Sequence, residues 1–159
     1  MSILIFSRKI NSGKTSELQQ WIDTSLDIGG ILMPDINNMR CMFNIRTSVL
    51  FDAQCTNENE PEDLLFNVGR FKFYKSAFQK ANNYLKEEIK HLPDTLIIDE
   101  IGKLELQGLG FNTSVIDAVR KYQLKSVKKV LILVVREELL KEVMHRYQIK
   151  KCKIVDSLV

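Results

Sequence analysis

A short glycine-containing segment has the residue types needed to bind phosphate. Ser12-Gly13-Lys14-Thr15-Ser16 follows the apolar run 3–6 and opens an amphipathic stretch. A glycine-rich loop between a strand and a helix turns successive backbone N–H groups inward, and the helix N-terminus adds positive potential. The segment therefore predicts a loop that binds the phosphates of a nucleotide, made by Asn11, Ser12, Gly13, Lys14, Thr15 and Ser16.

Four residues of this loop have a distinct expected role. Lys14 would reach the β- and γ-phosphate oxygens, and Thr15 would place its hydroxyl on Mg²⁺. Ser16 falls in the first turn of the helix, where its hydroxyl would meet the α-phosphate. Gly13 lets the backbone approach the phosphates where a β-carbon would clash.

A pair of acids far along the chain supplies the other half of such a site. Asp99 and Glu100 directly follow the apolar residues 96–98. A carboxylate at the tip of a buried strand needs a cation nearby, and Mg²⁺ held partly by substrate phosphates suits it. Asp99 would bind this ion through water or hydrogen-bond Thr15. Glu100 would orient or deprotonate the attacking water. The alternative is an Asp that caps a turn beside a solvent-exposed Glu.

One position departs from the full loop pattern Gly-x-x-x-x-Gly-Lys-[Ser/Thr], because Arg8 stands where the first glycine falls. Arg8 cannot adopt a positive φ as cheaply as glycine, so the loop is expected to begin with a different shape. The small residues Asn11 and Ser12 partly compensate. A Gly-Lys-Thr tripeptide at a helix start also arises by chance, so this segment alone leaves both interpretations open.

Bulk properties exclude several classes of protein. The 159 residues predict one domain, 1–159, with a core large enough to fold alone. No apolar run approaches the roughly 20 residues that span a bilayer. The three cysteines, Cys41, Cys55 and Cys152, show no Cys-x-x-Cys spacing, which argues against a disulfide framework or a zinc site and predicts a cytoplasmic protein.

The net charge of +3 is unevenly distributed along the chain. Residues 120–153 contain eleven Lys or Arg against three Glu. Solvated helix faces account for this excess, whereas a nucleic-acid surface would also need aromatic residues interleaved with the cations to stack bases. We therefore expect no nucleic-acid partner.

Alternating strands and helices predict an α/β fold with a mostly parallel sheet covered on both faces. Residues 3–6, 31–33, 96–98 and 130–135 are expected to be buried strands, with 153–155 as an added edge strand. Helices are expected from about Lys14 until Gly29-Gly30, over residues 76–91, after a capping Thr113, and from about Arg136.

The middle of the chain has a different pattern. Residues 42–47 and 48–53 alternate apolar and polar side chains and predict an antiparallel hairpin. Residues 54–63 are polar and acidic, which indicates an exposed loop. Residues 68–74 alternate again and predict one half-exposed strand.

One longer segment is far more specific than the glycine-containing loop or the acid pair alone. It reads Asp99-Glu100-Ile101-Gly102-Lys103-Leu104-Glu105-Leu106. It resembles the Asp-Glu-Ile-Gly-Lys-Met-Glu-Leu signature of the small P-loop nucleoside triphosphatases first described in thermophiles, which include the human cancer-related nucleoside triphosphatase. Looser similarities occur in segments 40–43 and 68–71 and at Phe111. The resemblance therefore extends over nearly the whole chain, with Leu104 in place of the usual Met.

The resemblance implies a RecA-like P-loop domain with an inserted β-hairpin. It also implies Mg²⁺-dependent hydrolysis of ATP, GTP or other nucleoside triphosphates to diphosphate and phosphate, by a hydrolase acting on phosphoric anhydrides with broad base tolerance. Gly13, Lys14, Thr15 and Ser16 carry over as the phosphate loop, with Lys14 catalytic. Asp99 carries over as the metal-site acid and Glu100 as the catalytic, water-positioning acid.

Other functions remain open at this point. Because Arg8 replaces the first loop glycine, the chain could bind nucleotide with weak or no hydrolysis. A small-molecule kinase shares the same loop, but no arginine-rich lid segment supports it. Lys103 and Arg136 could approach phosphate or be ordinary surface residues. The sequence leaves the preferred nucleotide, the pathway and the oligomeric state undetermined.

Overall fold

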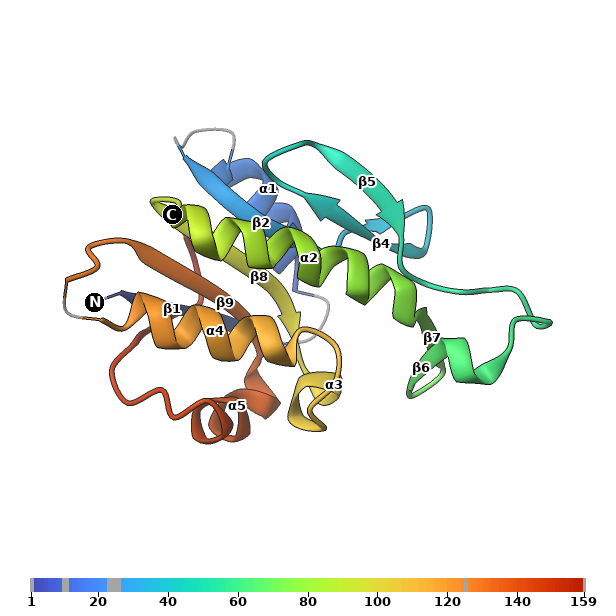
Figure 1. Cartoon of the computed structure of the whole chain (residues 1–159). Coiled ribbons are helices and arrows are strands. Elements are labelled where there is room, and N and C mark those ends of the chain that lie inside the picture. Colours follow the sequence, from blue (N-terminus) through green and yellow to red (C-terminus); the bar gives the residue numbers. More distant parts are fainter. Residues whose placement is uncertain (1, 10–11, 23–26, 125, 159) are drawn as a thin grey trace.

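A computed structural model describes residues 2–9, 12–22, 27–124 and 126–158, and a mixed sheet forms its centre (Figure 1). In the described part of the chain the sheet has eight strands, in the order β10-β1-β9-β8-β2-β4-β3, with β5 paired to β4. Their bounds are β1 Ile3–Arg8, β2 Ile28–Leu32, β3 Asp35–Ile36, β4 Met39–Asn44, β5 Val49–Asp52, β8 Thr95–Ile101, β9 Val130–Arg136 and β10 Lys153–Val155.

The five strands from β10 to β2 run parallel, so the sheet is mostly parallel, as predicted. β4 pairs antiparallel with β2, β3 and β5. β4 and β5 form the predicted inserted hairpin, although its first strand begins and ends three residues earlier than predicted. A second hairpin lies outside the main sheet and consists of β6 (Leu65–Val68) and β7 (Phe71–Tyr74). The helices are α1 Lys14–Ile22, α2 Lys75–His91, α3 Lys103–Leu106, α4 Asn112–Tyr122 and α5 Leu140–Arg146, with short 3-10 turns at Glu62–Leu64 and Glu137–Leu139.

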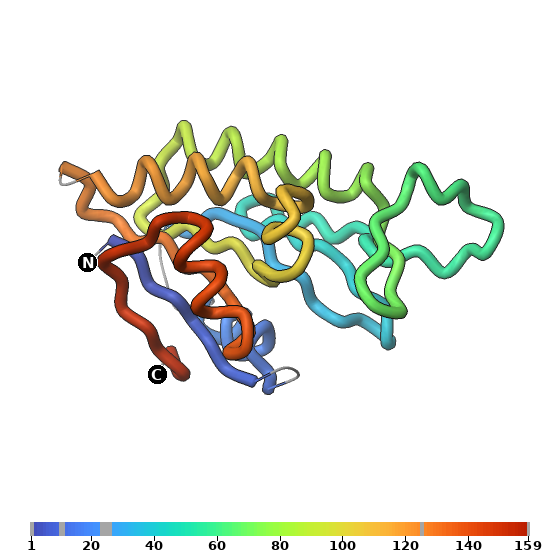
Figure 2. Tube along the Cα trace, turned by 90° about the horizontal axis from the view of Figure 1, so that it is seen from below, coloured from blue at the N-terminus to red at the C-terminus, as the bar shows by residue number. Residues whose placement is uncertain are grey.

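Helices cover both faces of the parallel strands, because each strand is apolar on both sides. Neighbouring residues of β8 belong to different clusters: Ile97 packs with Leu18 of α1, whereas Ile98 packs with the apolar faces of α2, α4 and α5. α2 and α4 lie side by side on their face of the sheet (Figure 2). The sheet is therefore the middle of three layers.

Several predicted element boundaries are wrong. The chain does not end α1 at Gly29-Gly30, since both glycines lie inside β2 and the helix ends at Ile22. Residues 68–74 form parts of two strands joined by a turn rather than one strand. Thr113 lies inside α4, and Phe111 precedes the helix. The last helix begins at Leu140, after a 3-10 turn.

The parallel arrangement decides where the functional residues meet. The carboxyl ends of β1, β9 and β8 gather at one edge of the sheet, as in other open α/β folds where ligands bind at this edge. The phosphate loop leaves β1 there, and the acid pair lies at the end of β8. No helix in the described part of the chain is long and apolar enough to cross a membrane.

Candidate functional site

The segment after β1 has the backbone of a phosphate loop where it is described. Gly13 has a φ of +82°, which a side chain would strain, and α1 begins at the next residue. The Lys14 ammonium is buried and donates a hydrogen bond to the Lys9 carbonyl at 3.0 Å. Ser12 and Ser16 are exposed at the cavity in front of the helix. Asn11, also predicted to bind phosphate, lies outside the described residues.

Burial controls the charge of the loop lysine. Desolvation lowers the pKa of Lys14, and the positive charges of Arg136 and Arg8 act in the same direction. The carboxylates of Glu100 and Asp99 oppose this by favouring the ammonium form. A bound polyphosphate would add further negative charge at this position. Lys14 is therefore a buried cation that an anionic ligand would stabilise.

Asp99 is fully buried at the end of β8 and accepts three hydrogen bonds. The Thr15 hydroxyl donates to Oδ2 at 2.9 Å, the Met33 N–H donates to the same oxygen at 3.0 Å, and the Glu100 N–H donates to Oδ1 at 2.8 Å. Burial, followed by repulsion from Glu100, raises the pKa of Asp99 to about 6. Thr15 and Asp99 are therefore in direct contact, as one of the two expected arrangements requires.

A β-bulge allows both acids to serve one site. Successive side chains of a regular strand point to opposite faces of the sheet, so Asp99 and Glu100 would be separated. The register between β8 and β9 shifts between Ile98 and Ile101, and Glu100 has a φ of +58°. A bulge re-aims side chains in this way and is common beside active sites. Asp99 can thus reach Thr15 while Glu100 faces the cavity.

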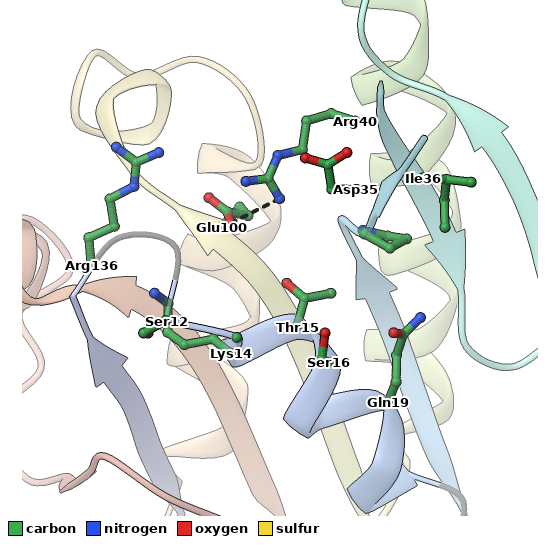
Figure 3. A pocket seen from close by; sticks show the side chains of 12 residues that line it. Ser12, Lys14, Thr15, Ser16, Gln19, Asp35, Ile36, Arg40, Glu100 and Arg136 are labelled. Atoms are coloured by element: carbon green, nitrogen blue, oxygen red, sulfur yellow. Dashed lines mark ion pairs between the residues drawn. The ribbon is translucent and has the colours of Figure 1, made fainter. Parts of the chain in front are cut away.

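One cavity of about 210 Å³ is lined by most of the predicted residues, namely Ser12, Gly13, Lys14, Thr15, Ser16 and Glu100 (Figure 3). Asp99 does not line it and is linked to it through the Thr15 hydroxyl. Glu100 lies between Arg40 and Arg136, and Lys14 and Thr15 lie on the helix side of the cavity. Sequence reasoning did not select Arg40, Asp35, Ile36 or Gln19, which also line it. Of these four residues, only Arg40 could have been selected from the sequence, since it is the first residue of segment 40–43, which resembles the family.

Arg8 stands where the loop pattern has its first glycine, but it does not extend into the loop. It is the last residue of β1, paired in register with Arg136 of β9, and its guanidinium contacts Glu17 of α1 at 2.8 Å. It also lies 5.0 Å from the centre of the Phe6 ring. Arg8 therefore ties β1 to α1, and its charge is balanced by Glu17.

Lys103 and Arg136 differ in their relation to this cavity. Arg136, at the end of β9, lines it directly. Lys103 is exposed at the start of α3 and lines a second cavity, which adjoins the first and shares Arg40, Glu100 and Arg136 with it. Of the two residues left undecided by the sequence, only Arg136 faces the phosphate loop.

Glu105 holds together the loop that follows the acid pair. Its carboxylate accepts hydrogen bonds from the N–H groups of Gly102 at 2.9 Å and Phe111 at 3.1 Å. Burial raises the pKa of Glu105 to about 7. The sequence predicted no role for this residue, although it belongs to the acid-pair signature, because the backbone N–H groups that its carboxylate contacts are known only from the folded chain.

The oxygen donors around Asp99 suit a hard cation such as Mg²⁺. Asp99 and the Thr15 hydroxyl are both oxygen ligands, and Mg²⁺ characteristically uses one or two carboxylates and completes its coordination with water and substrate phosphates. No cluster of three or more His, Cys, Asp or Glu side chains suited to a metal occurs among the described residues. The residues present therefore fit a metal that arrives with a phosphate ligand.

Comparison with known proteins agrees with this geometry. The model of a family described as NTPase matches residues 4–157. A crystal structure of THEP1 from the hyperthermophile Aquifex aeolicus superposes with a TM-score of 0.74, covers 98% of this chain and 89% of its own, and is 14% identical in sequence. This likeness shows a shared fold. No curated protein matches the sequence. Since the family match covers almost the whole chain, the protein belongs to this NTPase family.

Proposed function

We propose that this chain hydrolyses nucleoside triphosphates to the diphosphate and phosphate, with Mg²⁺ and with broad tolerance of the base. The observation that carries the proposal is the convergence of Lys14, the Thr15–Asp99 pair and Glu100 on one cavity at the carboxyl edge of the sheet. The family match supports nucleotide hydrolysis in general. The resemblance of the acid-pair signature supports base tolerance. The absence of disulfides among the three described cysteines is compatible with activity in the cytoplasm.

Binding would begin at the N-terminus of α1. The N–H groups of residues 13–16 and the positive end of the helix would face the phosphates. The Lys14 ammonium would exchange the Lys9 carbonyl for phosphate oxygens, since a charged partner is the stronger acceptor. Thr15 and Asp99 are the residues that would hold Mg²⁺, which when bound would neutralise charge on the β- and γ-phosphates.

Glu100 would activate the attacking water. A bond forms between the water oxygen and the γ-phosphorus, the bond from the γ-phosphorus to the bridging oxygen breaks, and the diphosphate leaves with that oxygen. Glu100 would accept the water proton, and the position of its carboxylate at the cavity supports this role. The proton then returns to the phosphate or to solvent.

The test is phosphate release from ATP, GTP, CTP and UTP, with Mg²⁺ and with a chelator. We expect release from all four with Mg²⁺ and none with the chelator. Lys14→Ala should lower kcat/KM by about 100-fold or more, because it removes a charge from the transition state. Lys90→Ala, an exposed lysine of α2 paired with Glu87, is the matched control and should be unaffected. Equal release by wild type and Lys14→Ala would refute the proposal.

A further inference from the structure

Arg40 is a cationic residue of the cavity that belongs to the inserted hairpin rather than to the parallel sheet. It lies on β4, and hydrogen bonds fix its backbone on both sides. Its N–H donates to the Gln54 side chain at 3.0 Å, and its carbonyl accepts from the N–H groups of Ala53 at 3.2 Å and Gln54 at 3.0 Å. The base of the side chain is therefore held in place while its end remains at the cavity.

The guanidinium of Arg40 forms an ion pair with Glu100, the acid in the β-bulge. Asp35 lies directly opposite Arg40 in the β3–β4 register, yet the ion pair of Arg40 is with Glu100, at 3.4 Å. The same nitrogen donates to the Met33 carbonyl at 2.9 Å. Arg40 thus reaches across from the hairpin to the residue proposed to activate water.

Met33 connects Arg40 to the metal-site acid as well. Its carbonyl accepts the Arg40 hydrogen bond, and its N–H donates to Asp99. Met33, directly after β2, therefore holds both Arg40 and Asp99 in place. The two acids of the bulge are each linked to the hairpin side of the cavity, one directly and one through Met33.

The Arg40–Glu100 ion pair is long and solvent-exposed enough for Arg40 to exchange Glu100 for another anionic partner. A nitrogen–oxygen distance of 3.4 Å exceeds the 2.7–2.9 Å of a strong charge-assisted hydrogen bond. Both side chains are 23% exposed, so solvent screens their attraction. Arg40 also borders the adjoining cavity, so the side chain has space on both sides of Glu100. A triphosphate, with several anionic oxygens, would compete effectively for this guanidinium.

We propose that Arg40 leaves Glu100 when a triphosphate binds and donates to the γ-phosphate, so that the inserted hairpin supplies the arginine that stabilises the transition state. This inference rests on the proposed hydrolysis. Negative charge shifts onto the transferred phosphoryl group and the leaving oxygen during phosphoryl transfer, and an arginine fork matches phosphate oxygens. The same movement frees the Glu100 carboxylate to take the water proton.

A purely restraining role for Arg40 predicts the opposite result. If Arg40 only neutralised Glu100 in the absence of nucleotide, its removal would free the carboxylate and leave turnover unchanged or faster. A role in the transition state instead predicts slower turnover with little change in ground-state affinity. The sign of the change in kcat therefore separates these two roles.

The experiment compares wild type with Arg40→Ala, Arg40→Gln and Arg40→Lys. Phosphate release gives kcat and KM, and equilibrium binding measures Mg·ADP with and without aluminium fluoride, which with ADP mimics the γ-phosphoryl group in transfer. Arg40→Gln can still donate to the Met33 carbonyl without a charge, so it separates charge from packing. Arg70→Ala, an exposed arginine at the β6–β7 turn, is the matched control.

Arg40→Ala and Arg40→Gln should lower kcat by about 100-fold and change the affinity for ADP by less than about threefold. The gain in ADP affinity from aluminium fluoride, about tenfold or more in wild type, should be lost in both. Arg40→Lys should recover part of the rate, because it keeps the charge but not the fork. Arg70→Ala should match wild type in every measurement.

If wild type releases phosphate, two results would refute the role of Arg40 without refuting the proposed hydrolysis. One is a kcat of Arg40→Ala equal to or above that of wild type. The other is an aluminium fluoride gain that survives in Arg40→Gln. A wild-type chain without Mg²⁺-dependent phosphate release would instead refute the proposed function, and the role of Arg40 with it.

Discussion

Arg8 shows how one residue can be replaced in a motif without loss of the loop's geometry. The position does not need a positive φ here, because Arg8 continues β1 in register with Arg136. The glycine that the loop does need is Gly13, with its φ of +82°. The guanidinium of Arg8 is directed to Glu17 rather than to the phosphate side of the loop. Slow or absent hydrolysis therefore does not follow from the missing glycine.

Arg8→Gly should restore the full loop pattern without raising phosphate release. It should lower the free energy of unfolding by about 1–2 kcal/mol, since it removes a partly buried ion pair and adds a flexible residue to a strand. Urea denaturation and the phosphate assay measure these effects. Glu17→Gln is the control, because it breaks the same ion pair and should cause part of the same loss. A tenfold gain in kcat for Arg8→Gly would mean that the glycine limits turnover after all.

The start of strand β2 and the β-bulge at Glu100 could not be predicted, because the local sequence at each is compatible with more than one structure. Gly29-Gly30 after a helical pattern indicates a helix end, yet both residues lie in β2. Glycine in a strand often marks close approach of another backbone, and a β-carbon on Gly30 would lie 2.0 Å from the Ile97 carbonyl oxygen. The bulge at Glu100 likewise has no composition of its own. Tertiary contacts, and not local preference, decide both.

Gly30→Ala should destabilise the protein far more than a glycine change at an open turn. The φ of +129° and the contact with β8 backbone predict a loss of about 3 kcal/mol or more in the free energy of unfolding. Gly69→Ala is the matched control, with a φ of +58° and open space around the new β-carbon, and should cost about 1 kcal/mol. Urea midpoints measure both. Equal losses would show that β2 and β8 can move apart at this point.

At the scale of the whole molecule, the apolar runs and the amphipathic helical pattern of the sequence predicted the fold. The short continuous apolar runs that became β1, β8 and β9 were predicted as buried parallel strands, and α2 was predicted within one residue. The order of the strands followed from no local pattern, and neither did the second hairpin at β6–β7. Gly13, Lys14 and the acid pair were predicted from sequence because their chemistry requires those residue types. Arg40 and Glu105 act through contacts that only the folded chain creates.

Stability should fall as the pH rises from about 4.5 to 7. The pKa of Glu105 is about 7 in the folded chain against an ordinary value of 4.5, so the folded state holds a proton that the unfolded state has released. The free energy of unfolding therefore decreases across this window by an amount on the order of 3 kcal/mol and levels off above it. The raised pKa of Asp99 acts in the same direction at lower pH.

Urea midpoints between pH 4.5 and 8 measure this dependence. Glu105→Gln should flatten the dependence above about pH 6, because glutamine does not titrate and the contribution of Asp99 lies at lower pH. Glu87→Gln, at an exposed position of α2, should leave the slope unchanged. A wild-type stability that increases from pH 5 to 7 would mean that Glu105 is ionised in the folded chain without cost.

The most direct measurement of the central claim compares nucleotide affinity with turnover in Glu100→Gln. The account places Glu100 at the attacking water and leaves phosphate binding to Lys14 and the loop, so these two properties must separate. Glu100→Gln should bind Mg·ATP within about threefold of wild type while its kcat falls by about 100-fold or more. Turnover close to wild type in Glu100→Gln would contradict the account.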